Sequence, residues 1–129
     1  MNREELTERT KEFAHRCVKL AMALPETSLG RHLRGQVIRC STSVAANYRA
    51  TCLSQSKASF TAKLSIVLEE ADEAAFWLEF IIDEKLLKKN LIEPLLLLKK
   101  NLIEPLLKEA RELTAIFASS RKTASTKIR

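Results

Sequence analysis

The sequence predicts a single all-α domain, and three observations support this prediction. Only two glycines and three prolines occur in the 129 residues, whereas the helix-favouring residues Ala, Leu, Glu, Lys and Arg are abundant. Apolar residues recur at steps of three and four, which places them on one face of a helix. The length suits one hydrophobic core and is too short for two ordinary domains.

Two long helices are predicted before residue 52. Pro25 ends the first, whose inner stripe comprises Leu6, Thr10, Phe13, Cys17, Leu20 and Leu24. The second follows the short connection 25–30 and continues to about Thr51, with the inner stripe Leu33, Val37, Cys40 and Val44. Residues 40–50 are rich in Ser, Thr and Ala, so another backbone can approach this helix closely.

A third helix is predicted to begin after an N-cap at Ser54 or Ser56 and to continue to about Lys89. Its inner stripe comprises Phe60, Leu64, Val67, Ala71, Ala74, Leu78 and Ile81. Further apolar residues lie on its other faces, among them Phe76, Trp77 and Phe80. Because contiguous exposed apolar area marks interfaces, these three side chains are the predicted contact between subunits. The alternative is that a thick core in a small bundle covers them.

The eleven-residue segment LLKKNLIEPLL occurs twice without a mismatch, at residues 86–96 and 97–107. One copy alone encodes the end of helix three, a turn and the start of helix four. Because a proline inside a helix costs about 3 kcal/mol, we expect a break at one copy, with residues 95–100 as a short additional helical piece. We assign the repeat no function.

The fourth helix is predicted to turn Leu106, Ala110, Leu113 and Phe117 inward. Residues 1–121 then form a single four-helix bundle domain, and residues 122–129 form a basic, frayed tail. The start of the chain is polar, and no apolar stretch is long enough to cross a bilayer, so a cytoplasmic protein without membrane association is expected. Cys17, Cys40 and Cys52 are odd in number and lack CxxC spacing, which suits small core residues in a reducing compartment.

Catalytic patterns are weak in this sequence. Glu12 and His15 have the Glu-x-x-His spacing of di-iron bundles, but the second such motif is missing. Glu73 with Glu69 or Glu70 could form an acid–base pair on helix three, although such runs are more often solvated or interface faces. There is no phosphate-binding glycine loop and no nucleophile motif. We therefore expect no enzyme, no metal, no cofactor and no small-molecule substrate.

The distribution of charge is the strongest functional signal. The net charge is +6, and the segment 27–68 contains no Asp or Glu. Its six cations are the predicted contacts to RNA or DNA phosphates: Arg31, Arg34, Arg39, Arg49, Lys57 and Lys63. In the alternative interpretation, these cations pair with the seven acids of residues 69–84, within the bundle or across a subunit boundary. The residues favour neither interpretation.

Three segments, 36–50, 54–60 and 70–80, resemble the four-helix-bundle proteins encoded in intervening sequences of bacterial 23S rRNA genes, a family similar to the accessory proteins of diversity-generating retroelements. The likeness covers residues 7–118 less one copy of the repeat. It is specific at Gln36, Arg39, Ser43, Val44, Ala45, Asn47, Ser54, Phe60, Glu73, Trp77 and Leu78. Two features depart from the family pattern. Tyr48, Arg49 and Ala50 replace a frequent Ala-Glu-Gly, which makes this segment more basic, and the doubled segment is not part of the pattern.

The resemblance implies an antiparallel up-down-up-down four-helix bundle that assembles as a ring of five subunits and has no known catalytic activity. For the retroelement relatives it implies nucleic-acid binding, which suits a basic surface repeated around a ring. The predicted function is a non-enzymatic oligomeric scaffold that binds RNA or DNA through a basic surface. The alternative is a structural or protein-interaction oligomer with no nucleic-acid role.

Overall fold

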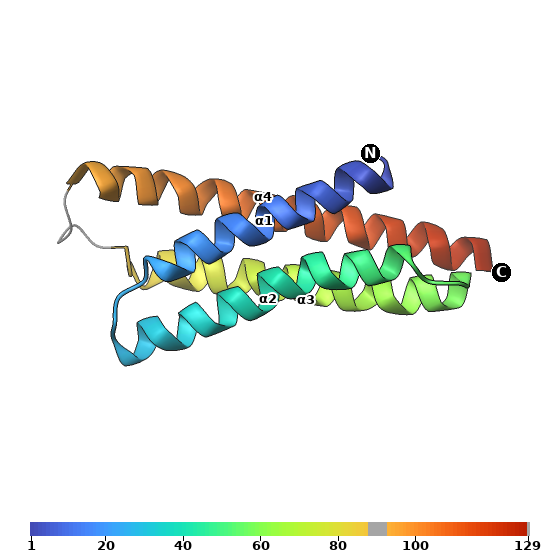
Figure 1. The fold of residues 1–129 in the computed structure, drawn as a ribbon, viewed down its shortest axis with the longest axis horizontal. Helices are drawn as coiled ribbons and strands as arrows, with labels where there is room; N and C mark the ends of the chain where they lie inside the picture. The colour runs from blue at the N-terminus through green and yellow to red at the C-terminus, as the bar shows by residue number, and fades with distance from the viewer. Residues whose placement is uncertain (88–92, 129) are drawn as a thin grey trace.

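The computed structural model describes the backbone of residues 1–87 and 93–128 and the side chains of residues 1–87 and 103–125. These residues form four helices, α1 (Arg3–Met22), α2 (Ser28–Cys52), α3 (Lys57–Asp83) and α4 (Glu93–Ile128). The predicted all-α class with four helices is confirmed, and the described residues contain no strand. The colours in Figure 1 show the chain reversing its direction at each of the three connections.

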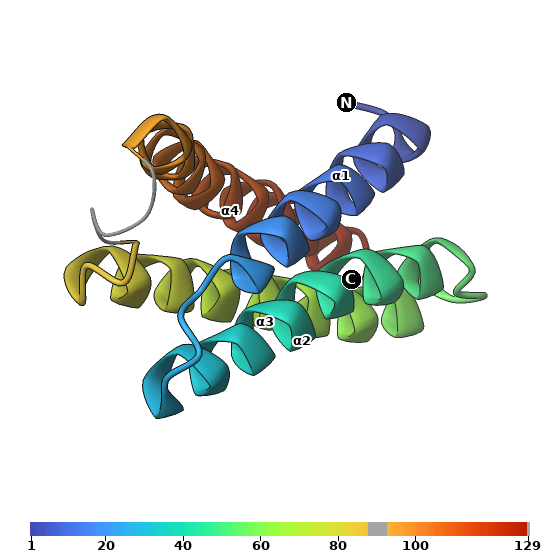
Figure 2. The same cartoon turned by 60° about the vertical axis from the view of Figure 1, so that its left-hand side comes forward.

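Each helix packs against its neighbour in sequence, and α4 also packs against α1. The α3–α4 and α2–α3 contacts are the most extensive, and the α1–α4 contact is the smallest. Figures 1 and 2 show α1 and α4 crossing and then diverging toward their ends. Arg9 joins these two helices, because its Nε donates to Glu109 Oε2 at 2.7 Å and its Nη2 to Glu109 Oε1 at 2.6 Å.

The core is built from the predicted inner stripes. In α1, α2 and α4 every predicted inner residue is buried, including Phe13, Val44 and Phe117. In α3 the same holds from Leu64 to Ile81, whereas Phe60 is only partly buried. Among the side chains that the structure describes, three polar residues are buried as well, and each hydroxyl donates to a carbonyl of its own helix: Thr10, Ser41 and Thr51. Local helical spacing therefore predicts the core well.

Side-chain caps define the starts of three helices. Asn2 accepts a hydrogen bond from the Glu5 amide at 2.8 Å, and Thr27 accepts one from the Gly30 amide at 3.0 Å. Of the two predicted caps for α3, Ser56 is the one used, because its Oγ accepts from the Ser59 amide at 3.0 Å. Each oxygen satisfies a backbone donor that has no partner within the helix.

The prediction that helix three continues to about Lys89 is wrong, because α3 ends at Asp83. Lys85 adopts a left-handed backbone with φ of 51°. The Leu86 amide donates to the Ile81 carbonyl at 3.3 Å, and the Lys85 amide donates to the Ile82 carbonyl at 3.0 Å. This pair of bonds is the Schellman motif, and Leu86 packs against the core beside it. Lysine replaces the usual glycine, so the sequence contains no visible stop signal.

The two copies of the doubled segment lie differently relative to the helices. α4 begins at Glu93 within the first copy, whereas the whole backbone of the second copy lies inside α4, Pro105 included. Residues 95–100 therefore belong to one continuous helix, and the separate piece predicted there is wrong. Ile103 before Pro105 and Leu106 and Leu107 after it are buried. Packing on both sides of the proline holds the helix together despite its local cost.

The far end of α4 includes the segment that the sequence analysis assigns to a tail. Its backbone remains helical through residues 122–128, where the sequence predicts a frayed tail. The division into a domain at residues 1–121 and a tail at 122–129 stays a prediction. No helix in the described part of the chain has the length and apolar character that a membrane span requires.

Candidate nucleic-acid interface

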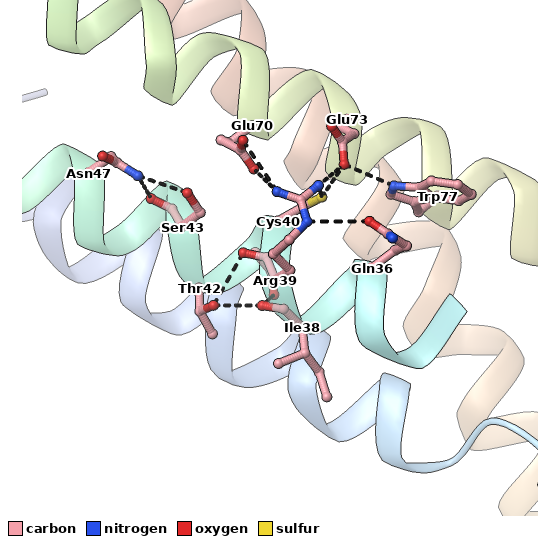
Figure 3. Close-up of polar contacts among 11 residues, drawn as sticks. Gln36, Ile38, Arg39, Cys40, Thr42, Ser43, Asn47, Glu70, Glu73 and Trp77 are labelled. Carbon is pink, nitrogen blue, oxygen red and sulfur yellow. Dashed lines mark hydrogen bonds and ion pairs between the residues drawn. The ribbon is translucent and has the colours of Figure 1, made fainter. Parts of the chain in front are cut away.

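Arg39 lies within a polar network between α2 and α3 (Figure 3). Its Nη1 donates to Glu70 Oε2 at 3.0 Å, its Nη2 pairs with Glu73, and its Nε donates to Gln36 Oε1 at 3.3 Å. Two carboxylates thus compensate its charge. For this cation the structure supports the alternative in which arginines of the acid-free segment pair with acids of helix three.

Glu73 is the centre of the same network. The Cys40 thiol donates to Glu73 Oε2 at 2.8 Å, and Trp77 Nε1 donates to the same oxygen at 3.2 Å. These two hydrogen bonds, with the charge of Arg39, hold the pKa of Glu73 below its ordinary value. The carboxylate is engaged by three partners, which favours a structural role over the acid–base role considered for it.

Arg34 and Arg31 hold the connection between α1 and α2. Arg34 donates to the Leu24 carbonyl at 2.9 Å and to the Ala21 carbonyl at 3.3 Å, and it pairs with Glu26 at 2.5 Å. Arg31 donates to the Glu26 carbonyl at 3.0 Å. The last carbonyls of a helix lack partners in the regular ladder of that helix, and Arg34 adds a donor to Ala21 in the last turn of α1 and to Leu24 just beyond it. Both predicted binding cations therefore have local structural roles.

The other three predicted cations gather at the opposite end of the molecule. Arg49 lies in the last turn of α2, and Lys57 and Lys63 lie in the first two turns of α3. Two cations that the sequence analysis missed join them, Arg3 at the start of α1 and Arg121 near the end of α4. Within the described residues, none of the five is in an ion pair. We call these five residues the basic pole.

Acids are few near the basic pole. Glu4 and Glu5 lie in the first turn of α1, but the acid-free segment 27–68 supplies the α2–α3 connection and the chain has no acid after Glu112. Figure 1 shows both termini and the α2–α3 connection on the same side of the molecule. Arg3 and Arg121 are far from the acid-free segment in sequence, so only the helix lengths and directions could have indicated them.

The predicted interface residues form an aromatic cluster on α3. The Phe76 ring lies 5.0 Å from Trp77 and 6.1 Å from Phe80 between centroids, and His32 meets Trp77 edge-on at 5.7 Å. Phe76 is 55% exposed, whereas Trp77 and Phe80 pack partly against the core. The bundle itself thus covers part of this cluster, and Phe76 remains as its outer surface.

The possible metal ligands Glu12 and His15 are exposed on α1. The side chains of residues 1–87 and 103–125 include no group of three potential ligands close enough to hold an ion.

Several positions that carry the family resemblance have visible roles. Gln36, Arg39, Glu73 and Trp77 belong to the polar network between α2 and α3. Asn47 Nδ2 donates to Ser43 Oγ at 2.7 Å (Figure 3), and Val44 and Leu78 are buried in the core. These positions therefore describe how α2 and α3 are joined and packed.

Comparison with known proteins agrees with this structure. The sequence profile of the 23S rRNA-intervening sequence protein family matches residues 3–118. The fold is similar to a crystal structure from Bacteroides thetaiotaomicron of a protein with unknown function from the S23 ribosomal protein family. That chain is 28% identical, the TM-score is 0.76, and the alignment covers 95% of the present chain and 99% of that chain. No curated protein matches the chain.

Proposed function

Because the chain belongs to the 23S rRNA-intervening sequence protein family, we propose that it is a non-enzymatic oligomeric scaffold that binds RNA or DNA phosphates through the basic pole. Its fold in that role is an antiparallel up-down-up-down four-helix bundle. The observation that carries the proposal is the gathering of Arg3, Arg49, Lys57, Lys63 and Arg121 at one end without an ion pair in the described residues.

Such a surface suits a polyanion for a general electrostatic reason. Cations near a nucleic acid release the counterions condensed on it, and this release drives binding whatever the base sequence. Arg31, Arg34 and Arg39 bind local partners. The proposed phosphate-binding surface therefore contains only three of the six predicted cations, and it also contains Arg3 and Arg121.

The test is a binding titration of labelled single-stranded and duplex oligonucleotides across a salt series. We expect affinity to fall steeply as salt rises. The double variant Arg49→Ala/Lys63→Ala should weaken binding and reduce the salt slope by about 0.7 for each single-strand phosphate that it no longer neutralises. The matched control, Lys19→Ala/Arg31→Ala, removes the same charge near the α1–α2 connection and should bind like the wild type. Absence of binding at low salt, or equal weakening in the two variants, would refute the proposal.

A purely structural or protein-interaction oligomer is the second candidate. The exposed Phe76 beside Trp77 and Phe80 favours it, since an aromatic side chain that is largely wet gains stability when a partner covers it. The family resemblance makes five subunits the first expectation, five times the chain mass of 14.6 kDa. Light scattering measures the mass directly, and Phe76→Glu should lower it. A monomeric mass for the wild type would remove this candidate.

A further inference from the structure

A cavity of about 590 Å³ opens at the basic pole. Its walls come from three parts of the chain that are far apart in sequence. These are Arg3 of α1, then Ser54, Gln55, Ser56, Lys57 and Phe60 around the start of α3, and Ser119, Ser120, Thr123 and Ala124 of α4. The volume falls in the range of pockets that bind small molecules, about 300–1,000 Å³. The side chains that line it indicate the class of ligand that it would bind.

The lining is rich in hydrogen-bond donors and has no carboxylate. Arg3 and Lys57 contribute positive charge and form no ion pair among the described residues. Ser56 Oγ accepts a hydrogen bond from the Ser59 amide, so its own O–H remains available to donate. Gln55, Ser119 and Ser120 have no side-chain hydrogen bond within the described part of the chain. Donors and cations without an opposing acid fit an anion, and phosphate suits this mixture best.

The start of α3 forms part of the same wall, and the positive end of its helix dipole adds to the attraction for an anion. This contribution is secondary to the side chains. Without Arg3 and Lys57 the helix end alone would not define a site.

An aromatic wall distinguishes this cavity from a simple anion site. Phe60 lines it and is only partly buried, and the Arg3 guanidinium lies 5.6 Å from the centroid of its ring. Phenyl rings and guanidinium planes are the surfaces on which unstacked bases pack. A base paired within a duplex is covered by its neighbours, so only an unpaired base could reach this wall.

We propose that the cavity holds one unpaired nucleotide of the bound strand, with its phosphate at Arg3 and Lys57 and its base against Phe60. This inference rests on the proposed function and adds a preference for single strands or frayed ends over continuous duplex. The exposed Arg49 and the partly buried Lys63 lie outside the cavity lining, and they would contact neighbouring phosphates of single strands and duplexes alike.

Competition on the wild-type protein tests the proposal without any variant. A labelled single-stranded oligonucleotide is displaced by AMP, by ribose 5-phosphate or by inorganic phosphate. AMP should compete at a concentration about tenfold lower than either of the other two, because only AMP has a base to stack. Equal competition by all three would show an anion site without a nucleotide preference and would overturn the proposal.

Single-residue variants provide a second test of the nucleotide site. Phe60→Leu keeps an apolar side chain at the position and should weaken single-strand binding about tenfold while leaving duplex binding unchanged. Lys57→Ala should weaken AMP competition, whereas Lys63→Ala, which removes the same charge outside the cavity, should not. If Phe60→Leu changes the affinity for neither single strands nor duplex, the nucleotide site is refuted, whereas phosphate binding by the basic pole is not. If no nucleic acid binds at low salt, both proposals fail together.

Discussion

The Cys40 thiol of α2 donates a hydrogen bond to the Glu73 carboxylate of α3, with Sγ and Oε2 separated by 2.8 Å. Cys40 is buried, whereas the Glu73 side chain is partly exposed, so the bond joins the core to the surface network around Arg39. The effect of this hydrogen bond on the stability of the fold and its effect on the reactivity of the thiol can be measured separately.

Replacing Glu73 with Gln should make stability less dependent on pH. The folded pKa of Glu73 lies below its ordinary value of 4.5, so the ionised group stabilises the fold fully above pH 4.5 and loses this effect as pH falls through the folded pKa. Glu73→Gln should cost about 1 kcal/mol near neutral pH, because Gln can still accept from Cys40 and Trp77 but cannot pair with Arg39.

Urea unfolding of the wild type and the variant at a series of pH values measures this effect. The difference between them should shrink as pH falls below 4.5. Glu70→Gln is the matched control, since Glu70 pairs with Arg39 but receives no hydrogen bond from Cys40 or Trp77. A Glu73→Gln difference that stays constant in acid would contradict the assignment.

The three cysteines should differ in reactivity. Burial raises the pKa of Cys17 to about 12, and burial followed by the bond to Glu73 raises the pKa of Cys40. Cys52 is only partly buried. Because the thiolate is the reactive species, iodoacetamide should label Cys52 first in the folded protein and all three in urea. Cys52→Ser should leave the folded protein almost unlabelled by mass spectrometry. Fast labelling of Cys40 would show that the α2–α3 contact opens readily.

The two glycines should respond to alanine in opposite directions. A Cβ on Gly30 would lie 2.0 Å from the Pro25 carbonyl oxygen, so the connection before α2 would have to move. A Cβ on Gly35 would meet nothing within 4 Å. We expect Gly30→Ala to destabilise by about 1–3 kcal/mol and Gly35→Ala to stabilise by about 0.5–1 kcal/mol. Thermal melts of both variants test the pair, and equal changes would show that the close approach to Pro25 is absent.

Removing one copy of the doubled segment should preserve the bundle. Leu86 and Leu87 of the first copy and Ile103, Leu106 and Leu107 of the second pack in or against the core. A single copy contains the same leucine or isoleucine at each of these five places in the segment. The proline would also return to the start of the helix, where it is tolerated. Circular dichroism and urea unfolding should show a cooperative transition at least as stable as that of the wild type. A non-cooperative transition would show that the extra turns of α4 are required.

Much of this fold is determined by the sequence itself. Helix identity and the inner faces depend on residues three and four apart, so local spacing was sufficient to place Phe13, Val44, Leu78 and Phe117 in the core. The N-cap at Ser56 was one of two predicted, because capping also depends on only a few neighbouring residues.

Only the tertiary structure determined where α3 ends, that α4 continues through Pro105, and which cations pair with acids. A lysine at φ 51° ends α3 because Leu86 packs against the core, and buried leucines carry α4 through Pro105. Likewise, Arg39 is neutralised by acids of another helix, whereas Arg49 and Lys57 are joined by Arg3 and Arg121 from the two ends of the chain. These outcomes depend on groups far apart in sequence, whose distances are fixed only when the four helices pack together.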